Sequence, residues 1–144
     1  MTYTDTIELL KECDSGTKMA VATFDEVLEH VSDSKLQDLL CESKKHHEKL
    51  GNEVHELLNK HHSDGMEPTP MAKGMSWLKT NVMLNMNEND ATIADLVTDG
   101  CNMGVKSLHK YLNHYQGADQ PSRNLCKRLA SIEAKLSEDL RAYL

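Results

Sequence analysis

Four side chains of this sequence could together hold a metal ion: Asp14, His46, His47 and Glu133. Carboxylate oxygens and imidazole nitrogens are ligands that iron, manganese and zinc accept in proteins. Each of these residues falls near the middle of a segment whose apolar side chains recur every three or four positions. The sequence therefore allows one mid-molecule metal site, built from three helices.

The apolar repeats predict four long helices and no strands. The first is expected from about Thr4 to Val31, the second from the turn at 32–34 to about His62, the third from Asn89–Asp90 to about Tyr115, and the last from Ser122 to Tyr143. A shorter amphipathic helix is expected within the long connection at 63–89. Two helical hairpins joined by one long crossover are the connectivity of ferritin-like bundles. We therefore expect residues 1–144 to form a single all-α domain, a ferritin-like four-helix bundle with a helix-containing crossover between helices 2 and 3.

Three short stretches carry a family resemblance: MAKGMSWLK at 71–79, IADL at 93–96 and GCNMG at 100–104. With these motifs the chain resembles small bacterial proteins of Firmicutes type, a ferritin-like four-helix-bundle family of unknown function. The resemblance covers nearly the whole chain in helix order. It implies the ferritin-like fold and no established activity.

Ferritin-like proteins that bind two metal ions take a carboxylate from each of two helices and a Glu-x-x-His pair from each of the other two. Here His46 could be the motif histidine of the second helix, but Ser43 stands in the place of the glutamate. In the last helix Glu133 is followed three positions later by Leu136 instead of histidine. On the third helix the nearest mid-helix acid is Asp99, beside glycines. Each metal motif is therefore half present.

The depth of the residues in the first hairpin leaves two readings open. If the hairpin folds back at 32–33, Asp14 lies opposite residue 51, about four residues or ~6 Å along the axis from His47. Asp14 and His47 could then form a buried hydrogen-bonded pair, which is the structural reading. Together with Glu133 they could instead form a mononuclear metal site.

Charge and cysteine content exclude several other classes of function. The chain has 16 Lys and Arg against 23 Asp and Glu, a net charge of -7, which disfavours nucleic acid and anionic lipid as partners. The N-terminus resembles no signal peptide and no segment is apolar enough to span a membrane, so we expect a cytoplasmic protein. The four cysteines form no Cys-x-x-Cys pair and are expected to be reduced, buried or half-buried thiols. No motif for nucleophilic catalysis is present.

The crossover has the composition of an interaction surface. Five of the eight methionines and the single tryptophan fall between residues 66 and 86. Methionine adapts to irregular surfaces and tryptophan is enriched at interface hot spots. A homodimer interface is therefore expected at Met71, Met75, Trp77, Leu78 and Val82, unless this segment packs on its own bundle.

Three functions remain open from the sequence. The favoured one is a non-enzymatic helical scaffold or interaction protein without an intact di-iron site and with no cofactor. The second is a protein that binds iron, manganese or zinc through a reduced mid-bundle site at Asp14, His46 or His47, and Glu133. The third is a binder of a small apolar ligand inside the bundle.

Overall fold

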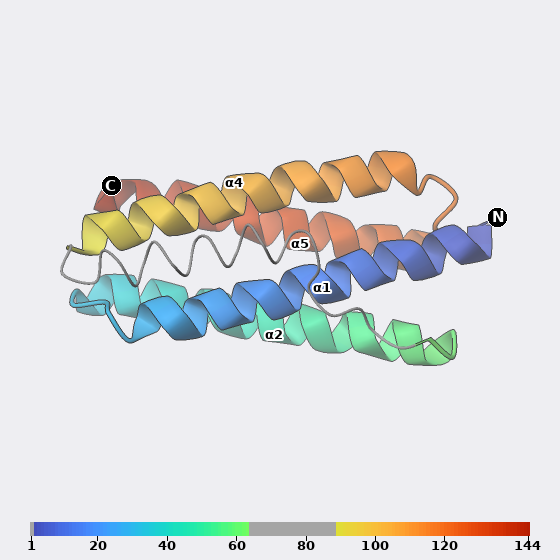
Figure 1. Ribbon diagram of the computed structural model, residues 1–144, viewed down its shortest axis with the longest axis horizontal. Helices are drawn as coiled ribbons and strands as arrows, with labels where there is room; N and C mark the ends of the chain where they lie inside the picture. Colours follow the sequence, from blue (N-terminus) through green and yellow to red (C-terminus); the bar gives the residue numbers. More distant parts are fainter. Residues whose placement is uncertain (1, 64–88) are drawn as a thin grey trace.

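The computed structural model describes residues 2–63 and 89–144, and all four of the predicted long helices are present there. They are α1 (Thr2–Leu28), α2 (Ser34–Lys60), α4 (Asp90–His114) and α5 (Gln120–Asp139), followed by a 3-10 helix, η1 (Leu140–Tyr143). They lie side by side along the long axis of the molecule (Figure 1). The described part of the chain contains no β-strand, and none of its helices is long and apolar enough to cross a membrane. The all-α prediction is confirmed.

Aspartate and asparagine side chains set the first residue of three helices. Asp33 accepts a hydrogen bond from the backbone N–H of Leu36 at 2.9 Å. Asn89 and Asp119 occupy the same capping position before α4 and α5. Such caps satisfy N–H groups that have no partner within the first turn of a helix. The sequence-based starts after the turn at 32–34 and at 89–90 agree with the structure, whereas the last helix begins at Gln120, two residues before the predicted Ser122, because Asp119 and not Ser122 is its cap.

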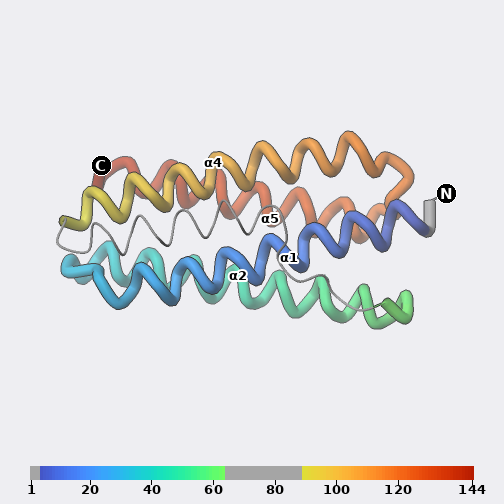
Figure 2. The backbone as a smooth tube through the Cα atoms, in the orientation of Figure 1, coloured from blue at the N-terminus to red at the C-terminus, as the bar shows by residue number. Residues whose placement is uncertain are grey.

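One end of the bundle is tied together by a single carboxylate. Asp90, the first residue of α4, accepts hydrogen bonds from the backbone N–H groups of Ser32 (2.9 Å) and Asp33 (2.7 Å) in the α1–α2 turn. The C-terminus lies at this same end, and the N-terminus at the opposite end beside the α4–α5 turn (Figure 2). The two hairpins therefore contact each other at this end of the bundle as well as along their lengths.

Helices α1 and α5 run parallel with one constant register. The hydroxyl of Thr6 accepts a hydrogen bond from the backbone N–H of Asp119 at 2.8 Å, and these residues are 113 positions apart. The same separation recurs at Gly16, where an added Cβ would lie 3.9 Å from the side chain of Leu129. Two contacts with one separation fix the register, which places residue 133 of α5 at the depth of residue 20 of α1.

Helices α1 and α2 run antiparallel, with a register that differs from the sequence-based one. Lys44 forms an ion pair with Asp25, and Gly51 lies against the side chain of Thr17. The numbers of facing residues therefore add to 68 or 69, not to the 65 expected from a fold-back at 32–33. The physical reason is that the two helix ends are not level: Leu28, the last residue of α1, faces residues 40 and 41, so the first turns of α2 extend beyond the end of α1.

The apolar core consists of two clusters. The first lies toward the N-terminus of α1 and the second toward its C-terminal end. Members of the first include Leu9, Leu10, Cys13, Leu50, Val54, Leu58, Leu108, Leu112, Leu125, Cys126 and Leu129, and members of the second include Phe24, Val27, Leu36, Leu40, Ile93, Val97, Cys101, Leu136 and Leu140. Between them, at about the depth of residues 20 and 21 of α1, lies a layer with buried polar side chains.

Candidate functional site

His47 is the most deeply buried titratable side chain of this middle layer. It comes from α2, its side chain is 1% exposed, and it stacks edge-on against Phe24 with ring centroids 5.1 Å apart. Its Nδ1 lies 2.8 Å from the backbone oxygen of Ser43. A carbonyl oxygen only accepts, so Nδ1 carries the proton and donates it. The other ring nitrogen, Nε2, is then an acceptor, and it has no hydrogen-bond partner among the described residues.

Burial keeps the imidazole of His47 neutral. Removal from water lowers its pKa from the usual 6.5, and the nearby His46 acts in the same direction, while the bond to Ser43 opposes both. A neutral ring with one fixed N–H and one free lone pair is also the form that binds a metal ion or accepts a proton.

Glu133 reaches the same depth from α5. Its carboxyl group lies against Gly104 of α4, where a Cβ atom would be only 3.0 Å from the carboxyl carbon and closer still to one oxygen. Burial raises the pKa of Glu133 to about 8, so at pH 7 the group is mostly the neutral acid and can donate a hydrogen bond. The glycine therefore makes room for the carboxyl group inside the bundle.

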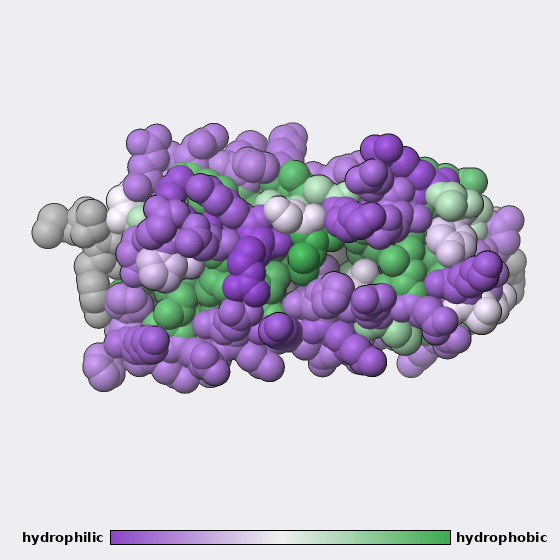
Figure 3. Space-filling model, turned by 180° about the vertical axis from the view of Figure 1, so that it is seen from behind, coloured by the Kyte–Doolittle hydropathy of each residue, from purple (hydrophilic) through white to green (hydrophobic). Residues whose placement is uncertain are grey.

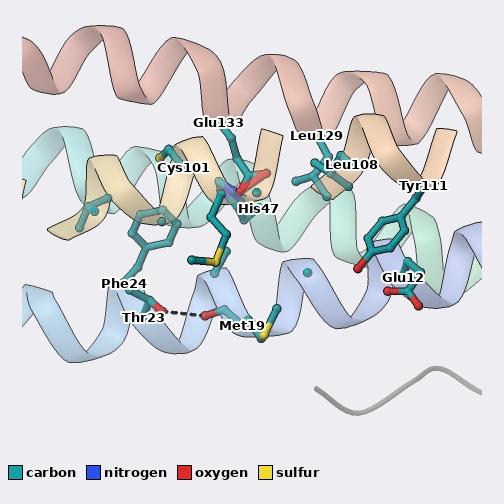
Figure 4. Close-up of a pocket in the computed structure, with 16 residues that line it drawn as sticks. Glu12, Met19, Thr23, Phe24, His47, Cys101, Leu108, Tyr111, Leu129 and Glu133 are labelled. Carbon is teal, nitrogen blue, oxygen red and sulfur yellow. Dashed lines mark hydrogen bonds between the residues drawn. The ribbon is translucent and has the colours of Figure 1, made fainter. Parts of the chain in front are cut away.

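His47 and Glu133 line one small cavity between the helices. Figure 4 shows Glu133 pointing from α5 toward the region occupied by His47, with Cys101 beside them. The cavity measures about 50 Å³. One water molecule needs roughly 10–15 Å³ by this measure, so about three waters fit. The protonated carboxyl group of Glu133 is thus a hydrogen-bond donor, and Nε2 of His47 an acceptor, for water in this cavity.

A second pair of polar groups lines the other side of the cavity. Tyr111 of α4 and Glu12 of α1 are hydrogen-bonded, and burial raises the pKa of Glu12 despite this bond. The pKa of Tyr111 rises to about 12, because of burial and the nearby carboxylate. The sequence analysis did not single out Glu12. Its signal, a glutamate on the inner half of a helix, is too common to be specific.

Asp14 and His46 lie elsewhere. Asp14 is buried but forms an ion pair with Lys18 at 2.8 Å, one turn along α1. It lines a groove between α1 and α2 whose far part His47 also borders, and it does not line the cavity that His47 shares with Glu133. His46 is exposed, with its nearest charged neighbour Glu42 at 3.9 Å. The predicted hydrogen-bonded pair of Asp14 and His47 is wrong, because Nδ1 of His47 bonds to Ser43 and Nε2 has no partner in the part of the chain that the structure describes.

The register of α1 and α2 explains this difference. Asp14 faces residue 54, and His47 faces residues 21 and 22. Seven residues, about 10 Å along a helix axis, therefore separate Asp14 from the level of His47. Within residues 2–63 and 89–144, no group of three or more His, Cys, Asp and Glu side chains could hold a metal ion. The predicted interface residues Met71, Met75, Trp77, Leu78 and Val82 lie outside the described residues.

The described residues do not fit the two-metal centre that active ferritin-like proteins carry. That centre needs a Glu-x-x-His pair from each of two helices. The structure buries Ser43 and Leu136 at the positions where a glutamate and a histidine would be required. It leaves one imidazole, His47, and two carboxyl groups on opposite sides of the cavity, Glu133 and the Tyr111-bonded Glu12.

Two cysteines that were not expected to pair meet in the first apolar cluster, which borders this layer. The thiols of Cys13 in α1 and Cys126 in α5 are hydrogen-bonded, which raises the pKa of Cys13 and lowers that of Cys126. Both side chains are fully buried. Cys101 lies apart from them, and burial raises its pKa to about 12. The prediction that the cysteines are reduced and buried or half-buried holds, with Cys41 half-buried.

Comparison with known proteins supports the fold and no specific activity. No protein-family model matches the chain, and no curated protein is similar to it in sequence. Among solved structures it is similar to the crystal structure of Dps92 from Deinococcus radiodurans, with a TM-score of 0.75 and 14% identity over 99% of this chain and 87% of that one. The finer resemblance to a Firmicutes family stays a prediction. At this low identity the likeness shows the fold alone: the chain is a four-helix bundle with the ferritin-like fold.

Proposed function

We propose that this chain is a non-enzymatic helical protein that keeps the ferritin-like fold without a two-metal centre and acts as a scaffold or interaction protein. The donor set of the middle layer carries this proposal. Metal-binding bundles converge several carboxylates and imidazoles on one point. Here His47, Glu133 and Glu12 line the cavity, but no three His, Cys, Asp or Glu side chains among the described residues converge closely enough to hold an ion.

The protonation of the pair supports the same conclusion. A carboxyl group with a pKa of about 8 is mainly neutral at pH 7, so binding a cation there would first require it to lose its proton. A neutral acid and a neutral imidazole leave no charge in the layer that an ion would have to balance.

A reduced metal site remains a second candidate, because one observation favours it. The backbone oxygen of Ser43 accepts a hydrogen bond from Nδ1 of His47, which leaves Nε2 free to bind a metal ion. Hydrogen bonds of this kind orient metal-binding histidines in other proteins. One iron, manganese or zinc ion with His47, Glu133 and water ligands would match this arrangement. A small organic ligand is disfavoured, since benzene needs a cavity of about 150 Å³ and this one measures about 50 Å³.

Elemental analysis separates the two candidates. Untagged protein from metal-replete medium should contain far less than one transition-metal ion per chain, and Glu133→Ala should contain the same amount. One or two ions per chain, lost in Glu133→Ala but kept in the exposed-site control His46→Ala, would overturn the scaffold proposal.

The interaction surface that we propose is the Met-rich segment identified from the sequence. Large exposed apolar side chains are scarce elsewhere: among the described residues only Met103 and Leu144 qualify. The face in Figure 3 is mostly hydrophilic, with apolar residues visible mainly along its middle. Wild-type protein should therefore dimerise at micromolar concentration in sedimentation velocity, and Trp77→Ala should weaken the dimer. A wild-type monomer under these conditions would contradict this assignment.

A further inference from the structure

Two cysteines from helices far apart in the sequence meet inside the first apolar cluster. The register of α1 and α5 places residue 13 opposite residue 126, because both Thr6 with Asp119 and Gly16 with Leu129 are 113 positions apart. The Cys13 and Cys126 thiols are within hydrogen-bonding distance of each other. Both are free, and both side chains are 0% exposed.

The hydrogen bonds around the two thiols give them different roles. Sγ of Cys126 donates to the backbone oxygen of Leu108 at 3.7 Å. Because the proton of Cys126 points at Leu108, the hydrogen bond between the two sulfurs uses the proton of Cys13, whose S–H donates to Sγ of Cys126. A donor directed at Cys126 stabilises its thiolate, and nearby Arg123 and Lys127 add positive charge, so the pKa of Cys126 falls even though the site is buried.

We propose that Cys13 and Cys126 form a redox-active dithiol that closes to an intramolecular disulfide between α1 and α5 when the protein meets a peroxide. The Cys126 thiolate attacks one peroxide oxygen, the O–O bond breaks, and the leaving oxygen takes a proton to become water. The product is the sulfenic acid of Cys126. Sγ of Cys13 then attacks the Cys126 sulfur, the S–O bond breaks, and the departing oxygen leaves as a second water with the proton of Cys13. The two thiols lose two electrons and the peroxide gains them.

Burial determines which oxidants react. A thiol without exposed surface is closed to bulky reagents in the native state, whereas hydrogen peroxide is close to water in size and can enter through small local openings of the bundle. Cys41 is half-buried on the outer part of α2. We therefore expect maleimides to label Cys41 first, and peroxide to link Cys13 with Cys126.

The experiment uses the full chain with Cys41→Ser and Cys101→Ser, so that only the proposed pair remains. Native protein is treated with hydrogen peroxide, quenched with catalase, alkylated in denaturant and digested with trypsin. Cleavage after Lys11, Lys18, Arg123 and Lys127 gives peptides 12–18 and 124–127, each with one cysteine. We expect these two peptides to be joined, and a reductant to separate them. Two alkylated, unlinked peptides at peroxide doses that oxidise Cys41 in wild-type protein would overturn the proposal.

Two serine variants in the same background test the roles. Cys13→Ser removes the resolving thiol, so dimedone should trap a sulfenic acid at Cys126. Cys126→Ser should leave Cys13 as an unmodified thiol. Dimedone on Cys13 in the second variant, with none on Cys126 in the first, would overturn the assignment of roles. Wild-type protein yields the same linked peptides without any substitution, so a folding defect in a serine variant leaves the test of the disulfide intact.

Discussion

The middle layer of the bundle and the apolar clusters on either side of it are equally buried but are built differently. Leu10 and His47 are 0% and 1% exposed. Leucines fill the clusters, whereas the layer contains an imidazole nitrogen without a partner among the described residues, an acid in contact with a glycine, and a cavity of about 50 Å³. Close packing stabilises a core, and buried polar atoms without partners reduce that stability. The difference indicates that the clusters hold the fold together and that the layer contributes little to stability.

The largest expected effect comes from exchanging a side chain in each region. Leu10→Ala should lower the free energy of unfolding by about 2–5 kcal/mol, because it leaves a cavity in a packed cluster. His47→Leu should change it by less than about 1 kcal/mol or raise it, since it replaces an unsatisfied acceptor with an apolar side chain of similar size. Urea unfolding of both variants measures the difference. Equal losses would show that His47 has a partner that stabilises the fold.

The next effect is a pH dependence that originates in the layer. Glu133 has a pKa of about 8 in the folded protein and near 4.5 when unfolded, so the folded state binds more protons between these values. Stability from this group is therefore present below about pH 4.5 and is lost as the pH rises through 8. The unfolding free energy of Glu133→Gln minus that of wild type should therefore increase by about 2–4 kcal/mol as the pH rises from 5 to 8.5.

This difference between variant and wild type isolates Glu133 from His47. The lowered pKa of His47 acts in the opposite direction, adding stability as the pH rises toward 6.5, but it is present in both proteins and cancels. Glu138→Gln, at an exposed position of the same helix, controls for the loss of a negative charge. A difference that does not change with pH would mean that the Glu133 carboxyl group is solvated.

The smallest effect compares two glycines. An added Cβ at Gly16 has room, with its nearest neighbour 3.9 Å away, whereas at Gly104 it would meet the Glu133 carboxyl group. Gly16→Ala should therefore stabilise the protein by up to about 1 kcal/mol through helix propensity, and Gly104→Ala should lose about 1–2 kcal/mol. Adding Glu133→Ala to Gly104→Ala should recover the loss, as measured by a double-mutant cycle. Equal gains at both glycines would contradict the placement of the Glu133 carboxyl group.

The sequence predicted the helices because their signals are local. Apolar residues at helical spacing and capping side chains such as Asp33 and Asn89 act within one or two turns. The long connection between the second and third helices then predicted the ferritin-like connectivity, which agrees with the structural likeness to Dps92. His47 was also identified in advance because it lies in the apolar stripe of its helix, and Glu133 because it is the glutamate of a half-present Glu-x-x-His motif.

The sequence could not determine how residues on different helices face each other. An offset of three to four residues in the register of α1 and α2 moved Asp14 away from His47. The 113-residue register of α1 and α5 placed Cys13 beside Cys126 and brought Glu133 to the level of His47. Gly104 makes room for the carboxyl group of Glu133, a contact between α4 and α5 that the sequence does not show. Local periodicity fixes which face of a helix is buried, but the depth at which two helices meet depends on turn length and on packing contacts that only the folded chain contains.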